Sequence, residues 1–155
     1  MVKGADGVEG IGKIGSRLFK NIDEFWAKIP AEYLDEVKLA FDGTPMLKYA
    51  EKDMILYRHI SANGPEISYW FARTIESPEN AKQLLALPKT NTAEHIVKVK
   101  ITEGTPYIEG KVASQVNNPS GLFDNTAIGG GNQLYFLQEN LSNIEKIEII
   151  INPLK

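Results

Sequence analysis

The stretch GGGNQLYF, residues 129–136, places three glycines directly before a polar pair and an apolar, aromatic segment typical of a strand. Glycine loses more backbone entropy on folding than any other residue, so three in succession are costly to order. A folded protein tends to keep such a run where its backbone must pass close to another group. The stretch therefore predicts a close-approach loop, with Gln133 at the edge of a functional site.

The composition fits one globular domain with a hydrophobic core, since 43% of the 155 residues are hydrophobic and 24% are charged. The chain has no cysteine and only two histidines, which excludes a disulfide framework and a thiol nucleophile and predicts no metal site. The net charge of −3 argues against broad binding of nucleic acid, although a local basic patch stays open. No stretch approaches the roughly 18 consecutive apolar residues of a membrane-spanning helix, and a signal-peptide pattern is lacking.

Residues 1–16 contain five glycines among small and charged residues, a composition typical of a linker. Gly7, Gly10 and Gly12, followed by Lys13, do not have the spacing of a phosphate-binding loop and follow no apolar strand. We therefore expect a flexible junction at residues 1–16 and a single domain at residues 17–155.

The first segment of this domain has the apolar periodicity of a helix. Four apolar residues recur at offsets of three, four and seven: Ile22, Phe25, Trp26 and Ile29. Pro30 suits the first turn of a second helix, which ends before Gly43. A third helix is expected to begin at Ser77 and Pro78 and to run to about Leu87.

Elsewhere in the domain, apolar residues recur with the shorter period that is typical of strands. We expect strands at residues 54–60, 67–74, 95–101, 104–113, 133–137 and 144–151, and a polar loop at residues 114–128. Helices followed by a mainly β region predict an α+β fold.

Arg58 lies in an otherwise apolar strand, between Tyr57 and His59. Such an arginine either faces solvent or binds an anion, because a guanidinium donates two parallel hydrogen bonds to phosphate or carboxylate. In the next strand, Trp70 and Phe71 point to opposite faces. Either ring packs in the core, or it stacks on a flat ligand in a cleft.

His59 and His95 can each titrate near neutral pH, so each is either a general acid or base or a structural hydrogen-bonding residue. The carboxylate pairs Glu76/Glu79 and Glu145/Glu148 have the spacing of solvated surfaces. No serine lies in a nucleophile-elbow pattern, which argues against a covalent serine hydrolase.

Several short motifs then follow one another in order: Tyr57-Arg58, Tyr69-Trp70-Phe71, AKQLLALP at 81–88, Asn91-Thr92-Ala93, Gly104-Thr105, GKVASQ at 110–115 and GGGNQ at 129–133. This series resembles the C-terminal toxin domains carried by contact-dependent inhibition and other polymorphic bacterial toxins, over about residues 57–136. The arginine strand, the ALP segment, the Gly-Thr turn and the Gly-Gly-Gly-x-Gln end resemble, more distantly, the tuberculosis necrotizing toxin family of NAD⁺ glycohydrolases.

The resemblance implies an antiparallel, split β-sheet like that of ADP-ribosyltransferases, with a cleft that grips NAD⁺. Arg58 would bind the pyrophosphate or ribose, and Gln133 would contact the nicotinamide ribose. Trp70 and Phe71 would hold the nicotinamide ring. The other implied substrate-binding residues are Tyr57, Gly130, Gly131 and Asn132. His95 is a further catalytic candidate. NAD⁺ would be a substrate, and no cofactor is implied.

Related transferases typically carry glutamate where this chain carries Gln133. An amide can hold the ribose by hydrogen bonds but cannot act as a base, so the departure favours hydrolysis by water over transfer to a protein acceptor. Cleavage of the N-glycosidic bond passes through an oxocarbenium-like state, which needs orientation and electrostatic support more than a strong nucleophile.

The leading hypothesis is therefore a bacterial toxin domain that hydrolyses NAD⁺ or NADP⁺ at the nicotinamide N-glycosidic bond. The alternatives are an ADP-ribosyltransferase, a non-enzymatic interaction domain, and a toxin ribonuclease that cleaves tRNA through a local basic cleft of Arg58, His59, His95, Lys98 and Lys100. A toxin implies delivery as part of a larger secreted or cell-surface carrier and action in the target-cell cytoplasm. It also implies a cognate immunity protein that blocks the cleft in the producing cell.

Overall fold

The computed structural model describes residues 18–155, so the predicted junction at residues 1–16 lies outside the described residues. The helices are α2 (Ile22–Trp26), α3 (Ala31–Leu39), α4 (Pro78–Leu84) and the 3-10 helix η1 (Gln138–Asn143). The strands are β2 (Met46–Tyr49), β3 (Met54–Ile60), β4 (Trp70–Phe71), β5 (His95–Ile101), β6 (Pro106–Lys111), β7 (Asn132–Phe136) and β8 (Ile144–Ile151). Within residues 18–155, no helix is long and apolar enough to cross a membrane.

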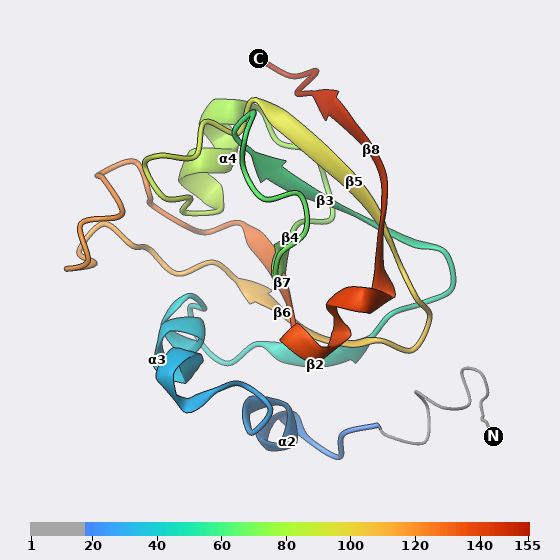
Figure 1. Ribbon diagram of the computed structural model, residues 1–155. Coiled ribbons are helices and arrows are strands. Elements are labelled where there is room, and N and C mark those ends of the chain that lie inside the picture. Colours follow the sequence, from blue (N-terminus) through green and yellow to red (C-terminus); the bar gives the residue numbers. More distant parts are fainter. Residues whose placement is uncertain (1–17) are drawn as a thin grey trace.

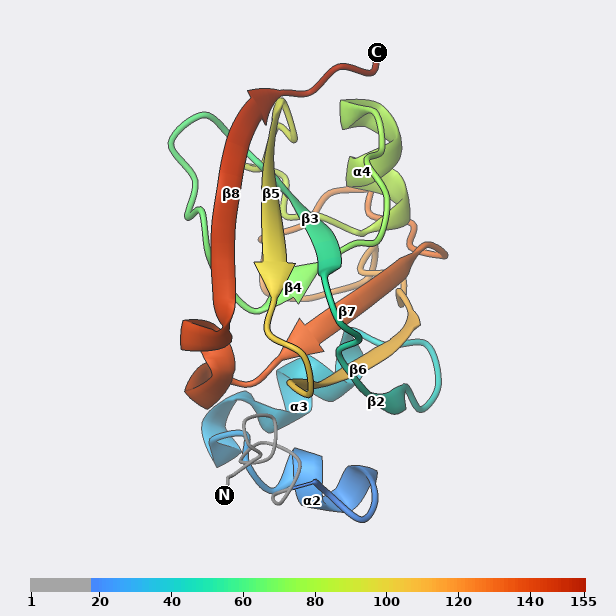
Figure 2. The same cartoon turned by 90° about the vertical axis from the view of Figure 1, so that its right-hand side faces the viewer.

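The strands form two antiparallel sheets, with the orders β2-β6-β7-β4 and β3-β5-β8. Figure 1 shows α2 and α3 at one end of the molecule and the three-stranded sheet at the other. In Figure 2 the long strands β5 and β8 run up the molecule, while β6 and β7 cross below them. The predicted α+β class and the antiparallel pairing are confirmed.

The two sheets meet at one isolated bridge. Tyr57 of β3 pairs with Ala72, the residue after β4, through two backbone hydrogen bonds of 2.9 and 2.8 Å. Because Trp70 and Phe71 pair with β7 on the other side, this short segment belongs to both sheets. The predicted strand at residues 67–74 is therefore reduced to two residues, since the chain changes partner at Ala72.

Strand β7 contributes to two cores on its opposite faces. Leu134 and Phe136 pack with β3 and β5 residues between the two sheets. Tyr135 faces the other way, where it packs with Phe25 of α2 and Val37 of α3. This alternation follows from the two-residue period of a strand.

Capping residues explain why the predicted helices begin where they do. The Asn21 side chain accepts a hydrogen bond from the Glu24 amide, and the Ser77 side chain accepts one from the Asn80 amide. Strand β2 was not predicted, because its four residues are exposed or half-buried and lack a clear alternation. It forms because it pairs with β6.

A buried carboxylate on β6 ties four segments of the larger sheet together. Glu109 forms ion pairs with Lys48 of β2 at 2.9 Å and with Arg73 at 2.6 Å, and it accepts a hydrogen bond from the Asn132 amide of β7. Burial would raise the pKa of Glu109, but the hydrogen bonds from Arg73, Lys48 and Asn132 outweigh it and lower that pKa to about 2. The network holds the start of β7, one residue before Gln133.

The three glycines run between the end of α4 and residues 112–113. The Gly129 amide donates to the Gln83 carbonyl at 2.7 Å, and the Gly131 amide donates to the Leu84 carbonyl at 3.0 Å. A Cβ on Gly129 would lie 2.7 Å from the Val112 carbonyl oxygen. The close approach expected at this run is thus an approach to the protein's own backbone.

Gly129→Ala is expected to lower the free energy of unfolding by about 3 kcal/mol, because the new methyl group meets backbone and the position has a φ of 81°. Gly130→Ala is the matched control, since Gly130 has a φ of 100° but open space around it. It should cost only about 1 to 2 kcal/mol. Chemical denaturation measures both values, and equal losses would contradict the assigned close approach.

Candidate functional site

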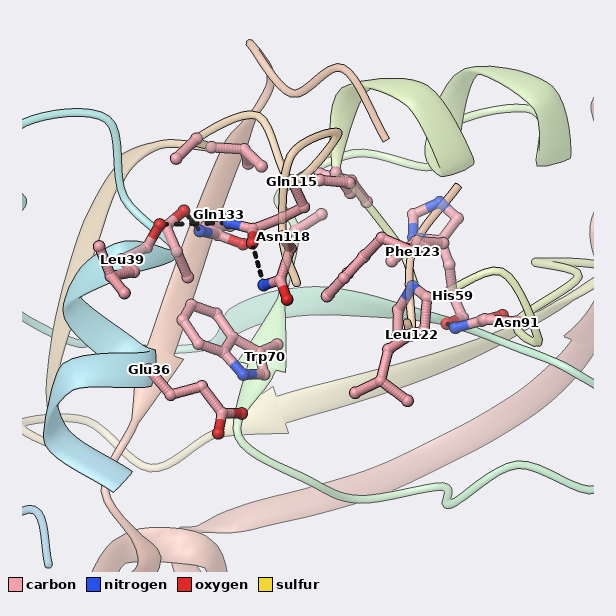
Figure 3. A pocket seen from close by; sticks show the side chains of 18 of the residues that line it. Glu36, Leu39, His59, Trp70, Asn91, Gln115, Asn118, Leu122, Phe123 and Gln133 are labelled. Atoms are coloured by element: carbon pink, nitrogen blue, oxygen red, sulfur yellow. Dashed lines mark hydrogen bonds between the residues drawn. The ribbon is translucent and has the colours of Figure 1, made fainter. Parts of the chain in front are cut away.

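A cleft of about 700 Å³ opens beside the junction of the two sheets. Its walls come from the end of α3, from β3 and β4, from the segment after α4 and from the loop of residues 114–128. A volume of this size is typical of small-molecule and cofactor sites. Figure 3 shows the cleft with Gln133, Gln115 and Asn118 at one end and His59, Asn91 and Leu122 at the other.

Of the nine residues that the resemblance implied, the cleft brings together five: Tyr57, Arg58, Trp70, Phe71 and Gln133. Four other selected residues, Gly130, Gly131, Asn132 and His95, are not among its lining residues. All four have other contacts: Asn132 binds Glu109, His95 pairs with Ile60 at the start of β5, and the amides of Gly130 and Gly131 donate to the Val112 and Leu84 carbonyls.

The basic residues expected for a ribonuclease do not gather in the cleft. Lys98 and Lys100 are absent from its lining, and Lys100 forms an ion pair with Asp53 at 3.2 Å. Arg58 and His59 are the members of that set that the cleft contains.

Gln133 is buried on β7, and its orientation is set by a hydrogen bond. The side-chain Nε2 donates to the Ala40 carbonyl at 2.9 Å. No described residue donates a hydrogen bond to its Oε1. Gln133 therefore offers a positioned carbonyl acceptor to a hydroxyl group in the cleft.

Two further amides continue this polar end of the cleft. The Gln115 side chain donates to the Leu39 carbonyl at 3.2 Å, and it accepts a hydrogen bond from the Asn118 side chain at 2.8 Å. The last carbonyls of α3 are thus bound by side chains from β7 and from the loop at 114–128. Gln115 and Asn118 were not predicted as site residues, although Gln115 ends the GKVASQ segment.

Arg58 donates hydrogen bonds to two neutral backbone carbonyls. Its Nε donates to the Pro65 carbonyl at 3.0 Å, and its Nη1 donates to the Trp70 carbonyl at 3.3 Å. Among the described residues, no carboxylate forms an ion pair with it. Burial lowers the pKa of Arg58 to about 10, so it stays charged at neutral pH. A half-buried cation without a counter-ion favours the binding of an anionic ligand.

The two aromatic residues have different roles. Phe71 is buried and packs edge-on against Phe136, with ring centroids 5.7 Å apart. Trp70 is only half-buried, and Phe41 and Tyr135 lie 5.6 and 4.7 Å from its ring. Trp70 is therefore the ring available to a flat ligand, whereas Phe71 belongs mainly to the core.

His59 is buried in the wall of the cleft and is neutral. Its Nε2 accepts a hydrogen bond from the Glu76 amide at 2.9 Å, and burial lowers its pKa to about 4. Because the acceptor nitrogen is already used, His59 is poorly suited to accept a proton at neutral pH.

No family model matches the sequence, and no curated protein matches it. The structure of Tne2 in complex with Tni2 matches at 16% identity, covering 75% of this chain and 99% of the matched chain, with a TM-score of 0.55. The structure of Tse6 in complex with Tsi6 matches at 14% identity, covering 81% and 90%, with a TM-score of 0.56. Rhs1-CT in complex with its cognate immunity protein RhsI1 matches at 20% identity, covering 71% and 83%, with a TM-score of 0.44. The chain shares the fold of the first two matched chains.

The depressed pKa of His59 predicts a loss of stability in mild acid. The unfolded chain binds this proton near pH 6.5 and the folded chain only near pH 4, so stability falls as the pH drops through that window. We expect about 2 kcal/mol to be lost between about pH 7 and about pH 5. His59→Asn should flatten this pH dependence in denaturation experiments. An unchanged slope in the variant would show that another group is responsible.

Proposed function

We propose that this chain is a toxin domain that hydrolyses NAD⁺ at the bond between nicotinamide and ribose. The observation that carries the proposal is the pairing of Arg58 and Gln133 in one cleft. Within residues 18–155, the first is a cation without a counter-ion, and the second is an amide whose carbonyl oxygen accepts no hydrogen bond. These are the groups that a dinucleotide with an anionic diphosphate and neutral ribose hydroxyls requires.

In the proposed complex, Arg58 binds the diphosphate and Trp70 stacks on the nicotinamide ring. The Oε1 atom of Gln133 accepts a hydrogen bond from a hydroxyl of the nicotinamide ribose. Each contact uses a group that the fold already orients, which reduces the entropy lost when the substrate binds.

The reaction then breaks the bond between the ribose C1′ and the nicotinamide nitrogen, and the bonding pair stays on that nitrogen. Nicotinamide leaves as a neutral molecule. Water adds to the resulting oxocarbenium-like carbon and releases a proton to solvent, giving ADP-ribose. Because Gln133 is not a base, the site supports attack by water rather than activation of a protein acceptor. NAD⁺ and NADP⁺ share all the groups used here.

We propose residues 17–155 as the catalytic domain and residues 1–16 as its junction with a larger carrier. The carrier would deliver the domain into the cytoplasm of a target cell. A cognate immunity protein would protect the producing cell. The resemblance of the motif series to polymorphic toxin domains supports this, as does the shared fold with chains from two-protein complexes.

Arg58→Met and Gln133→Ala should each lower kcat/KM for NAD⁺ by on the order of 100-fold, because each removes an orienting contact. Release of nicotinamide, measured by liquid chromatography, gives the rate. Gln133→Ala should fold, since the Ala113 amide also donates to the Ala40 carbonyl, at 2.9 Å.

Lys98→Met is the control, because it removes a cation that does not line the cleft. It should retain activity within about twofold. Full activity in both cleft variants would remove these residues from the site. Unchanged NAD⁺ with the unaltered protein at high concentration would refute the proposed function.

A further inference from the structure

The cleft contains a second formal charge, opposite in sign to Arg58. Of the described residues that line it, Glu36 of α3 is the only carboxylate, and Arg58 is the only arginine or lysine. Glu36 is exposed, and it forms no ion pair within the described part of the chain. Each charge in the cleft is therefore open to a charged group of a ligand.

The position of Glu36 follows from helical spacing. Glu36, Leu39 and Ala40 lie at offsets of three and four, so one face of the end of α3 borders the cleft. The same face carries the Ala40 carbonyl, which holds Gln133. Glu36 was not predicted as a site residue, because a single carboxylate on an exposed helix position carries no local signal.

Glu36 lies at the end of the cleft that holds Trp70 and Gln133. Figure 3 shows it with Trp70 and Leu39, on the side of Gln133 and away from Asn91 and Leu122. Burial, and then the charges of Tyr69 and Glu36, raise the pKa of Tyr135 to about 12. The Tyr135 ring lies 4.7 Å from that of Trp70. The negative charge of Glu36 thus acts on the Tyr135 hydroxyl, and the Tyr135 ring packs against the indole that would hold the nicotinamide ring.

We infer that Glu36 recognises the positive charge of a pyridinium ring and makes the cleft selective for oxidised over reduced nicotinamide dinucleotides. This inference rests on the proposed function. An oxidised dinucleotide carries a negative diphosphate and a positive ring, whose charges are opposite to those of Arg58 and Glu36, respectively. The face of an indole such as Trp70 also attracts cations. A reduced dinucleotide keeps the diphosphate, but its nicotinamide ring is neutral.

The test compares two ligands that the protein cannot hydrolyse at this bond. Carba-NAD⁺ has the cationic ring but a carbocycle in place of the nicotinamide ribose, and NADH has the neutral ring. Calorimetry at low salt gives both dissociation constants for the unaltered chain and for Glu36→Gln. We expect Glu36→Gln to weaken carba-NAD⁺ binding by about fivefold and NADH binding by less than about twofold, because an exposed charge pair is only moderately strong.

Asp35→Asn is the matched control. Asp35 is exposed on the same helix but does not line the cleft, and the substitution changes the net charge by the same amount. It should leave the ratio of the two dissociation constants unchanged. Salt at about 1 M should reduce the preference of the unaltered chain for carba-NAD⁺, since exposed charges are then screened over about 3 Å.

Equal weakening of both ligands by Glu36→Gln, or no weakening of either, would overturn the role of Glu36. The proposed function would still stand if the unaltered chain hydrolyses NAD⁺. The same loss in Asp35→Asn would assign the effect to net charge and overturn the inference too. An unaltered chain that neither binds carba-NAD⁺ nor hydrolyses NAD⁺ would refute both proposals.

Discussion

Two backbone hydrogen bonds between Tyr57 and Ala72 join the two sheets, and the cleft depends on that junction. Trp70 and Phe71 pair with β7 immediately before the chain reaches Ala72. The junction therefore places Arg58, the residue after Tyr57, within reach of the Trp70 carbonyl. Arg58 and Trp70 lie on strands of different sheets, and this junction brings them together.

Glu109 and Arg58 differ in how their charges are compensated, and this difference distinguishes a structural role from a ligand-binding role. Glu109 is buried with hydrogen bonds from Arg73, Lys48 and Asn132, so its charge is compensated within the fold. Among the described residues, Arg58 is held only by carbonyl groups of Pro65 and Trp70. The compensated charge of Glu109 connects segments of the sheet, whereas the uncompensated charge of Arg58 can bind an anion.

The starts of helices were predicted best, because nearby side chains determine them. Asn21 and Ser77 cap their helices through their own side chains, and a cap is visible in a sequence. Strand β2 and the shortened β4 could not be predicted, because each depends on the partner it pairs with. For the site, Arg58 and Gln133 were selected from their sequence context and from the resemblance, and both line one cleft. Glu36, Gln115 and Asn118 carry no local signal and were missed.

The glycine run at 129–131 shows the division between sequence and tertiary structure. By itself, the sequence determined that backbone must approach something closely there and that a strand beginning near Gln133 follows, because only glycine tolerates such contacts. The tertiary structure decided that the approach is to α4 and residues 112–113. It also decided that the Ala40 carbonyl orients Gln133, since a hydrogen bond between residues 93 positions apart depends on how the elements pack.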